Sequence, residues 1–186
     1  LSGSEKDTMD HALIDMPSVR DIVRVLTTEH SARDRSHMKN RPSYGISLAI
    51  DGEIVYKHKG KRYVSDSEHV VILPKGQSYE LECVKSGKFT LFNFQLDRDI
   101  ELDSFRVIKI SKPERILAVH KKAESVFLSH QKSKWMRLLS CFYEIAAIIM
   151  EEFEASETPF ILKKAMRMIE EQTANHELSN IWLAKE

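Results

Sequence analysis

The sequence predicts an α+β fold in which an antiparallel β-sandwich or small barrel precedes a set of helices. Two observations support this prediction. Between residues 19 and 110, short runs rich in Val, Ile, Tyr and Phe alternate with turn-forming residues, which is typical of strands. After Ser111, the apolar residues recur at helical spacing instead. A chain of 186 residues is long enough for one domain and part of another.

Eight strand-like runs precede residue 111, and local turns separate most of them. They cover residues 21–27, 44–50, 53–58, 62–64, 69–73, 79–84, 88–96 and 105–110. Asp51-Gly52 is the dipeptide most favoured in a two-residue hairpin, so we expect the two runs that flank it to pair with each other. Lys59-Gly60 marks a further tight turn. Short strands at this spacing favour a sandwich or a small barrel.

Two helices are expected after the strands. Ser111 and Glu114 fit a capping box, and Pro113 suits the first turn of a helix. A second helix, over residues 134–153, carries a wide apolar stripe that another surface must cover. Packing against the β-rich half and dimerisation would each cover it, and the sequence does not separate the two.

The ends of the chain differ from its middle. Residues 1–18 are polar and mixed in charge, which predicts an N-terminal arm. Residues 154–158 form a polar linker, and Thr158-Pro159 is typical of a helix start. A helical pattern is still running at Glu186, so we expect the chain to stop inside a further domain.

Composition excludes several classes of protein. The 28 basic and 28 acidic side chains balance, whereas a chain that grips nucleic acid usually has a basic excess. Cys83 and Cys141 form no CxxC pair, which predicts reduced thiols and a cytoplasmic location. No apolar run approaches the roughly 18–20 residues of a membrane span, so no membrane association is expected.

Two groups of residues match the signature of a known family. The first is Arg41-Pro42-Ser43-Tyr44, Asp51-Gly52-Glu53, Tyr63, Val70 to Leu73 and Pro74-Lys75-Gly76. The second is Ala165, Ile169-Glu170, His176, Leu178-Ser179 and Leu183-Ala184. The first group resembles the N-terminal cupin signature of AraC/XylS-type bacterial transcription regulators. The second resembles the opening of their helix-turn-helix domain, although Asn180 and Trp182 depart from its usual pattern.

This resemblance implies a division of labour along the chain. Residues 19–112 would form a cupin-like antiparallel β-barrel that binds an effector, and the arm before it would fold over the ligand. Residues 113–153 would form a helical pair for packing and dimerisation. After the linker, residues 159–186 would be the truncated start of the DNA-binding domain. The full-length protein would bind DNA, but this fragment would not, because the recognition helix lies beyond it.

The function implied is that of an effector-controlled regulator and not of an enzyme. The partners expected are a small-molecule effector, for which a sugar is one candidate, and a second copy bound through the helix at 134–153. Cupin enzymes hold a metal through histidines and a glutamate. Here His58 is followed at position 60 by Gly60, and Tyr79 occupies another ligand position. We therefore expect no metal, no cofactor and no catalytic residue. A module controlled by a protein partner and a metal-dependent cupin enzyme are the alternatives.

The expected ligand site lies inside the barrel. Residues 90–95 alternate, so Asn93 and Gln95 point into the pocket if Phe92 and Phe94 face the helices. In the opposite register, the two phenylalanines line the pocket. Arg41, Tyr44 and Tyr79 occupy positions that the resemblance places at the pocket mouth. The predicted ligand-binding residues are therefore Arg41, Tyr44, Tyr79, Asn93 and Gln95.

Overall fold

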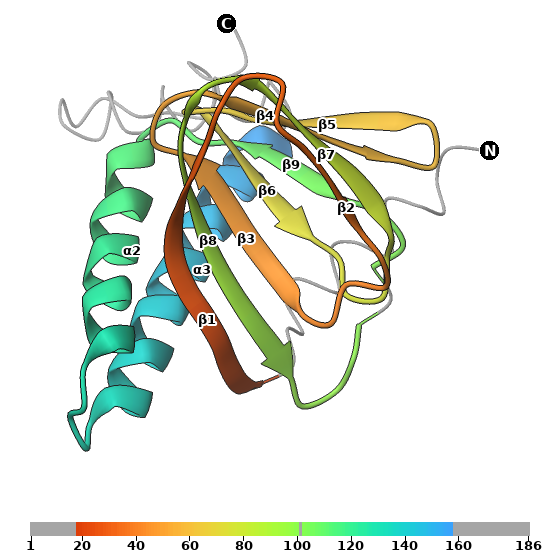
Figure 1. Cartoon of the computed structure of the whole chain (residues 1–186). Helices are drawn as coiled ribbons and strands as arrows, with labels where there is room; N and C mark the ends of the chain where they lie inside the picture. The colour runs from red at the N-terminus through yellow and green to blue at the C-terminus, as the bar shows by residue number, and fades with distance from the viewer. Residues whose placement is uncertain (1–17, 101, 158–186) are drawn as a thin grey trace, which may run out of the picture. The chain divides into compact units, whose positions relative to one another are not determined.

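Nine strands and two helices make up the part of the chain that the computed structural model describes, residues 18–100 and 102–157 (Figure 1). The strands are β1 (Val19–His30), β2 (Arg35–Met38), β3 (Tyr44–Ala49), β4 (Glu53–His58), β5 (Lys61–Ser65), β6 (His69–Leu73), β7 (Tyr79–Lys85), β8 (Gly87–Leu96) and β9 (Arg106–Lys109). The helices are α2 (Pro113–Leu128) and α3 (Lys134–Glu157). Residues 1–17 of the expected arm, and the expected DNA-binding segment 159–186, lie outside the described residues.

The strands form two antiparallel sheets. The five-stranded sheet has the order β1-β8-β3-β6-β9, and the four-stranded sheet has the order β2-β7-β4-β5. Helices α2 and α3 lie against the five-stranded sheet (Figure 1), and the four-stranded sheet packs on its other face. No strand pairing joins the two sheets in the described part of the chain, so they form a cupin-like β-sandwich and not a closed barrel. The predicted α+β class is confirmed.

The expected hairpin around Asp51-Gly52 is wrong in its pairing. Strand β3 pairs with β6 and β8, whereas β4 pairs with β5 and β7 in the other sheet. The dipeptide still reverses the chain direction locally, and Gly52 has a φ of +90° there. Glycine suits this position, because a β-carbon would lie 2.7 Å from the carbonyl oxygen of Lys85. The turn therefore carries the chain between sheets. In contrast, Lys59-Gly60 closes the β4–β5 hairpin, with positive φ at both residues, as a type I′ turn requires.

The helix boundaries also differ from the predictions. The expected capping box is wrong: Lys112 is the N-cap of α2 and makes no side-chain cap, while the backbone N–H of Ser111 donates to Glu152 at 3.1 Å. Ser111 thus joins the start of α2 to α3 instead of capping its own helix. Helix α3 runs to Glu157, so most of the segment expected as a linker is helical. Strand β2, which has no apolar alternation, was not predicted.

The first hydrophobic core lies between the five-stranded sheet and the helices. Phe142 of α3 is fully buried there, and its ring centroid lies 5.8 Å from that of Phe92 and 4.7 Å from that of Phe94. The apolar stripe of α3 is covered by this packing, through Leu138, Cys141, Phe142, Ile145, Ile148 and Ile149. Polar contacts reinforce it, since Glu124 of α2 accepts from the backbone N–H of Thr27 at 2.6 Å.

The second core lies between the two sheets and is rich in aromatic rings. Phe105 is stacked on Tyr56 and Tyr63, with centroid distances of 5.4 and 5.0 Å, and meets Tyr79 edge-on at 5.1 Å. Cys83 is buried in the same core as a free thiol. The five-stranded sheet therefore has an apolar layer on each face, which is why its strand β3 is buried at every residue.

Replacing Phe142 with alanine should destabilise the chain by about 3–5 kcal/mol, because it leaves a cavity between α3 and β8. Met136 of the same helix is 70% exposed, so Met136→Ala should change the free energy of unfolding by less than about 0.5 kcal/mol. Urea unfolding followed by circular dichroism measures both. Similar losses for the two variants would contradict the placement of α3 on the sheet.

Candidate functional site

A buried arginine joins the two sheets. Arg41 precedes β3, and its Nη1 donates to the hydroxyl oxygen of Tyr79 at 2.7 Å. Its Nη2 donates to Oδ1 of Asn93 at 2.5 Å. Tyr79 belongs to β7 of the four-stranded sheet and Asn93 to β8 of the five-stranded sheet. The structure thus brings three of the five predicted site residues together at the space between the sheets.

Backbone contacts and a glycine place the guanidinium. The N–H of Arg41 donates to the carbonyl oxygen of Gln77 at 3.0 Å, and its carbonyl oxygen accepts from Gly76 at 2.8 Å. A β-carbon on Gly45 would lie 2.5 Å from Arg41 Nη2 and 3.0 Å from Asn93 Oδ1. A side chain at position 45 would therefore collide with the cluster, so Gly45 leaves the room that the guanidinium occupies.

The positive charge of this cluster lacks an acidic counterpart. Arg41 is only 4% exposed, and no ion pair to it is formed within the described residues. Its two side-chain partners, Tyr79 and Asn93, are neutral. Its Nε is buried and has no hydrogen-bond partner among the residues described. A buried charge is stable only when it is well paired and hydrogen-bonded, so this arrangement leaves a site that favours an anion.

Aromatic rings surround the side of the cluster formed by Tyr79. The ring of Tyr79 meets Tyr56 edge-on at 5.6 Å, and Phe105 lies against both. The Tyr56 hydroxyl donates to Oγ of Ser47 at 3.2 Å. Burial raises the pKa of Tyr56 to about 12, so its hydroxyl stays neutral and does not balance the charge of Arg41. The site therefore combines one cation with an apolar, aromatic surface.

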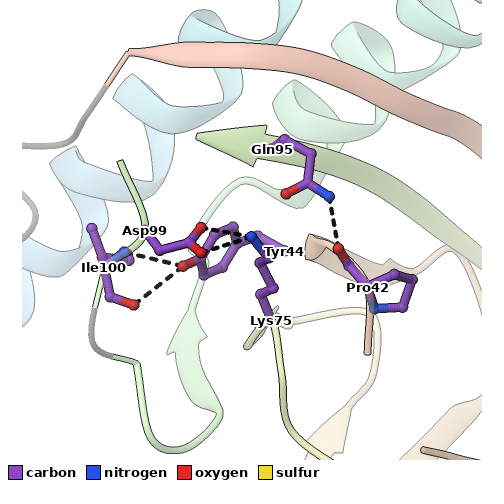
Figure 2. A network of polar contacts seen from close by, with 6 residues as sticks. All are labelled: Pro42, Tyr44, Lys75, Gln95, Asp99 and Ile100. Atoms are coloured by element: carbon purple, nitrogen blue, oxygen red, sulfur yellow. Dashed lines mark hydrogen bonds and ion pairs between the residues drawn. The ribbon is translucent and has the colours of Figure 1, made fainter. Parts of the chain in front are cut away.

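Gln95 lies near this cluster but is held separately. Its Nε2 donates to the carbonyl oxygen of Pro42 at 2.7 Å, as Figure 2 shows. Its Oε1 is buried and has no hydrogen-bond partner in the described part of the chain. Gln95 and Asn93 are two residues apart in β8 and so project from the same face, while Phe92 and Phe94 pack on α3. Of the two registers left open by the sequence, the structure has the one in which the phenylalanines face the helices.

Tyr44 does not join the arginine cluster. It pairs with Phe94 in the sheet and stacks on its ring at 5.7 Å, so it projects toward the helices. Its hydroxyl accepts from the backbone N–H of Ile100 and donates to the carbonyl oxygen of Ile100, both at 3.1 Å (Figure 2). Burial raises the pKa of this hydroxyl. Beside it, Lys75 and Asp99 form an ion pair at 2.7 Å. Tyr44 therefore holds Ile100 after β8 and projects from the sheet face opposite to that of Asn93 and Gln95.

His58, at the end of β4, is buried. Its Nδ1 lies 2.8 Å from the carbonyl oxygen of Ser78, and its Nε2 lies 3.3 Å from that of Asp103. Both ring nitrogens thus face backbone carbonyl oxygens, and a neutral imidazole can donate to only one of them. Within the residues described, no three His, Cys, Asp or Glu side chains gather in a way that could hold a metal ion. No helix in that part is long and apolar enough to cross a membrane.

Two residues of the site were missed by the sequence analysis. Gly45 was overlooked because a glycine within an apolar run normally signals weak strand packing, although it also marks the close approach of another group. Phe105 was assigned to a strand, whereas it lies just before β9 and inserts between the sheets. A single aromatic residue at the end of a polar loop gives no periodic signal, so only the fold reveals its role.

The fold of this chain is similar to that of several solved structures. Apo ToxT K231A from Vibrio cholerae strain SCE256 aligns with a TM-score of 0.50 and 12% identity, over 79% of this chain and 64% of that one. The AraC-like transcriptional activator CuxR aligns with a TM-score of 0.47 and 8% identity, over 87% and 65% of the respective chains. A structure of wild-type ToxT with bound unsaturated fatty acid aligns with a TM-score of 0.47 and 11% identity, over 84% of this chain and 65% of that one.

The predicted resemblance to AraC-type regulators is confirmed for the fold. At 12% identity the likeness shows the fold alone. The chain spans 64% of the length of the ToxT chain with which it aligns. No protein-family model and no curated protein matches the sequence.

Replacing Tyr79 with phenylalanine should destabilise the chain by about 1–3 kcal/mol, because it removes an acceptor from a buried charged group and nothing else. Tyr143→Phe is the matched control. Tyr143 is 45% exposed and its hydroxyl accepts from Val19 at 3.3 Å, where water can replace it, so the change should be within about 0.5 kcal/mol. Chemical denaturation of both variants tests this. An undiminished stability for Tyr79→Phe would mean that the Arg41 contact contributes nothing.

Proposed function

We propose that the chain is the effector-sensing and dimerisation region of an AraC-type transcription regulator that acts in the cytoplasm. A small molecule binds between the sheets, and its binding controls DNA binding by the regulator. The observation that carries the proposal is the buried, incompletely satisfied Arg41, which bridges the two sheets through Tyr79 and Asn93. ToxT, whose fold is similar, has been solved with an unsaturated fatty acid, and small-molecule binding by this chain is part of the proposal.

The route from ligand to helices runs through β8. Asn93 contacts Arg41 on one face of this strand, and the flanking Phe92 and Phe94 contact Phe142 of α3 on the other. A ligand that takes over the bond between Asn93 and Arg41 therefore acts one residue away from the helix contacts. Binding shifts the balance between two arrangements of α3 by the difference in affinity for them. The output is a change in the spacing or mobility of paired DNA-binding domains.

The site supports binding rather than catalysis. Arg41 has neutral partners, and the surrounding rings of Tyr56, Tyr79 and Phe105 offer apolar contact. Both nitrogens of His58 are directed at carbonyl oxygens. We therefore assign the cluster the role of recognising a ligand. The four rings packed around Phe105 favour one second candidate, a module controlled by a protein partner, because side chains already occupy much of the space between the sheets.

A thermal-shift screen should identify a stabilising small molecule. The panel consists of sugars, amino acids, aromatic acids, fatty acids, nucleotides and divalent metals. A ligand at 100 times its dissociation constant stabilises the folded chain by about 2.7 kcal/mol. For a chain of this size that is a rise of roughly 5–10 °C in the melting temperature. A response to metals alone would favour the enzyme alternative, and no response would favour the protein-controlled module.

Dimerisation should depend on the outer face of α3. Met136 and Tyr143 are seven residues apart, so they share one face of the helix, and both are exposed apolar side chains. Met136→Glu should weaken the homodimer at least tenfold and leave the circular dichroism spectrum of the folded monomer unchanged, because it places a charge in the interface and leaves the core intact. Lys121→Glu, at an exposed position of α2, is the control. Sedimentation at several concentrations measures the association. If the wild-type chain is monomeric, or if the variant associates normally, the face that carries Met136 and Tyr143 is not the dimer interface.

A further inference from the structure

Two buried polar atoms at the site, one donor and one acceptor, have no hydrogen-bond partner among the residues that the structure describes. Nε of Arg41 is a charged donor, and Oε1 of Gln95 is a neutral acceptor. The orientation of the Gln95 amide is fixed, because its Nε2 donates to the carbonyl oxygen of Pro42, an atom that can only accept. Pro42 directly follows Arg41, so this bond joins Gln95 to the same segment of backbone that carries Arg41.

The chemistry of these two atoms indicates which functional groups a ligand needs in order to bind them. An arginine that is buried without an acid attracts a carboxylate, whose oxygens accept from the planar guanidinium in a charge-assisted bond. A neutral hydroxyl would accept from Arg41 but leave the charge unbalanced. The acceptor of Gln95 requires a donor on the same ligand. A hydroxyl group suits it, since an ammonium group near the Arg41 cation would be repelled.

We infer that the effector is an organic acid that also carries a hydroxyl group, the carboxylate bound by Arg41 and the hydroxyl by Gln95. The inference rests on the proposed function, because it names the ligand class of the same site. The rings of Tyr79, Tyr56 and Phe105 beside the guanidinium accommodate an apolar or aromatic substituent on the acid. The sugar considered from the sequence lacks the negative charge that this site calls for.

Matched compounds test the two groups separately. The probes are lactate, mandelate and 3-phenyllactate, each beside its primary amide and beside the acid without the hydroxyl (propionate, phenylacetate and 3-phenylpropionate). Melting temperatures of the 186-residue chain are measured with each. At least one hydroxy acid should raise the melting temperature by several degrees, its amide should give no shift, and the acid without the hydroxyl should bind at least tenfold more weakly. Gln95→Leu should abolish that last difference.

The second test introduces a carboxylate from the protein itself beside Arg41. Asn93→Asp keeps the shape of the side chain but places a carboxylate on the atom that already lies 2.5 Å from Arg41 Nη2. The unliganded variant should melt at a higher temperature than the wild type, and hydroxy acids should no longer shift it. Asn40→Asp makes the same charge change at an exposed residue outside the cluster and should keep the wild-type response. If Arg41 were only structural, Asn93→Asp would be stabilised yet still respond to the acids.

The outcomes separate this inference from the proposed function. Binding of a neutral compound, such as a sugar or an amide, with no preference for acids would overturn the anionic ligand and leave the sensor function standing. Equal binding of acids with and without the hydroxyl would overturn the role of Gln95. The absence of any shift with these probes and with the wider panel would overturn both.

Discussion

Strand β8 is the element on which the rest of this structure depends, because its two faces belong to different cores. Phe92 and Phe94 project into the core shared with the helices, and Asn93 and Gln95 project from the opposite face. The strand also pairs on both edges, with β1 and with β3. A one-residue slip in either pairing would bury two polar side chains against α3 and take Asn93 away from Arg41. The register of β8 therefore sets both the fold and the site.

The space between the two sheets combines closely packed aromatic rings with one buried positive charge. Most of the space between the sheets is occupied by aromatic rings that pack closely around Phe105. At one place, Gly45 has no side chain and admits a guanidinium that forms no ion pair with any acid in the described ranges. Such an arrangement costs stability relative to an apolar filling of the same volume. A binding role offers a physical reason for keeping it, since a ligand that supplies the missing charge would recover part of that cost.

Several independent bonds hold the described residues between β8 and β9. Tyr44 holds Ile100, Lys75 pairs with Asp99, and His58 meets the carbonyl oxygen of Asp103. Phe105 then anchors the loop in the core between the sheets. Through its bonds to Ile100, Tyr44 positions the chain that leads to Phe105. Its place on the helix-facing side follows from its pairing with Phe94.

The sequence by itself determined the elements and much of the site. Periods of two and of 3.6 residues located most of the strands and both helices, and the alternation around Asn93 named the polar residues of β8. What the sequence left open depended on contacts between distant segments. Asp51-Gly52 specified a turn but not the partner of the strands beside it, because a turn is local and a sheet partner is not. The burial of His58, and the meeting of Arg41 with Tyr79 and Asn93 across 38 and 52 residues, were decided only when the two sheets packed face to face.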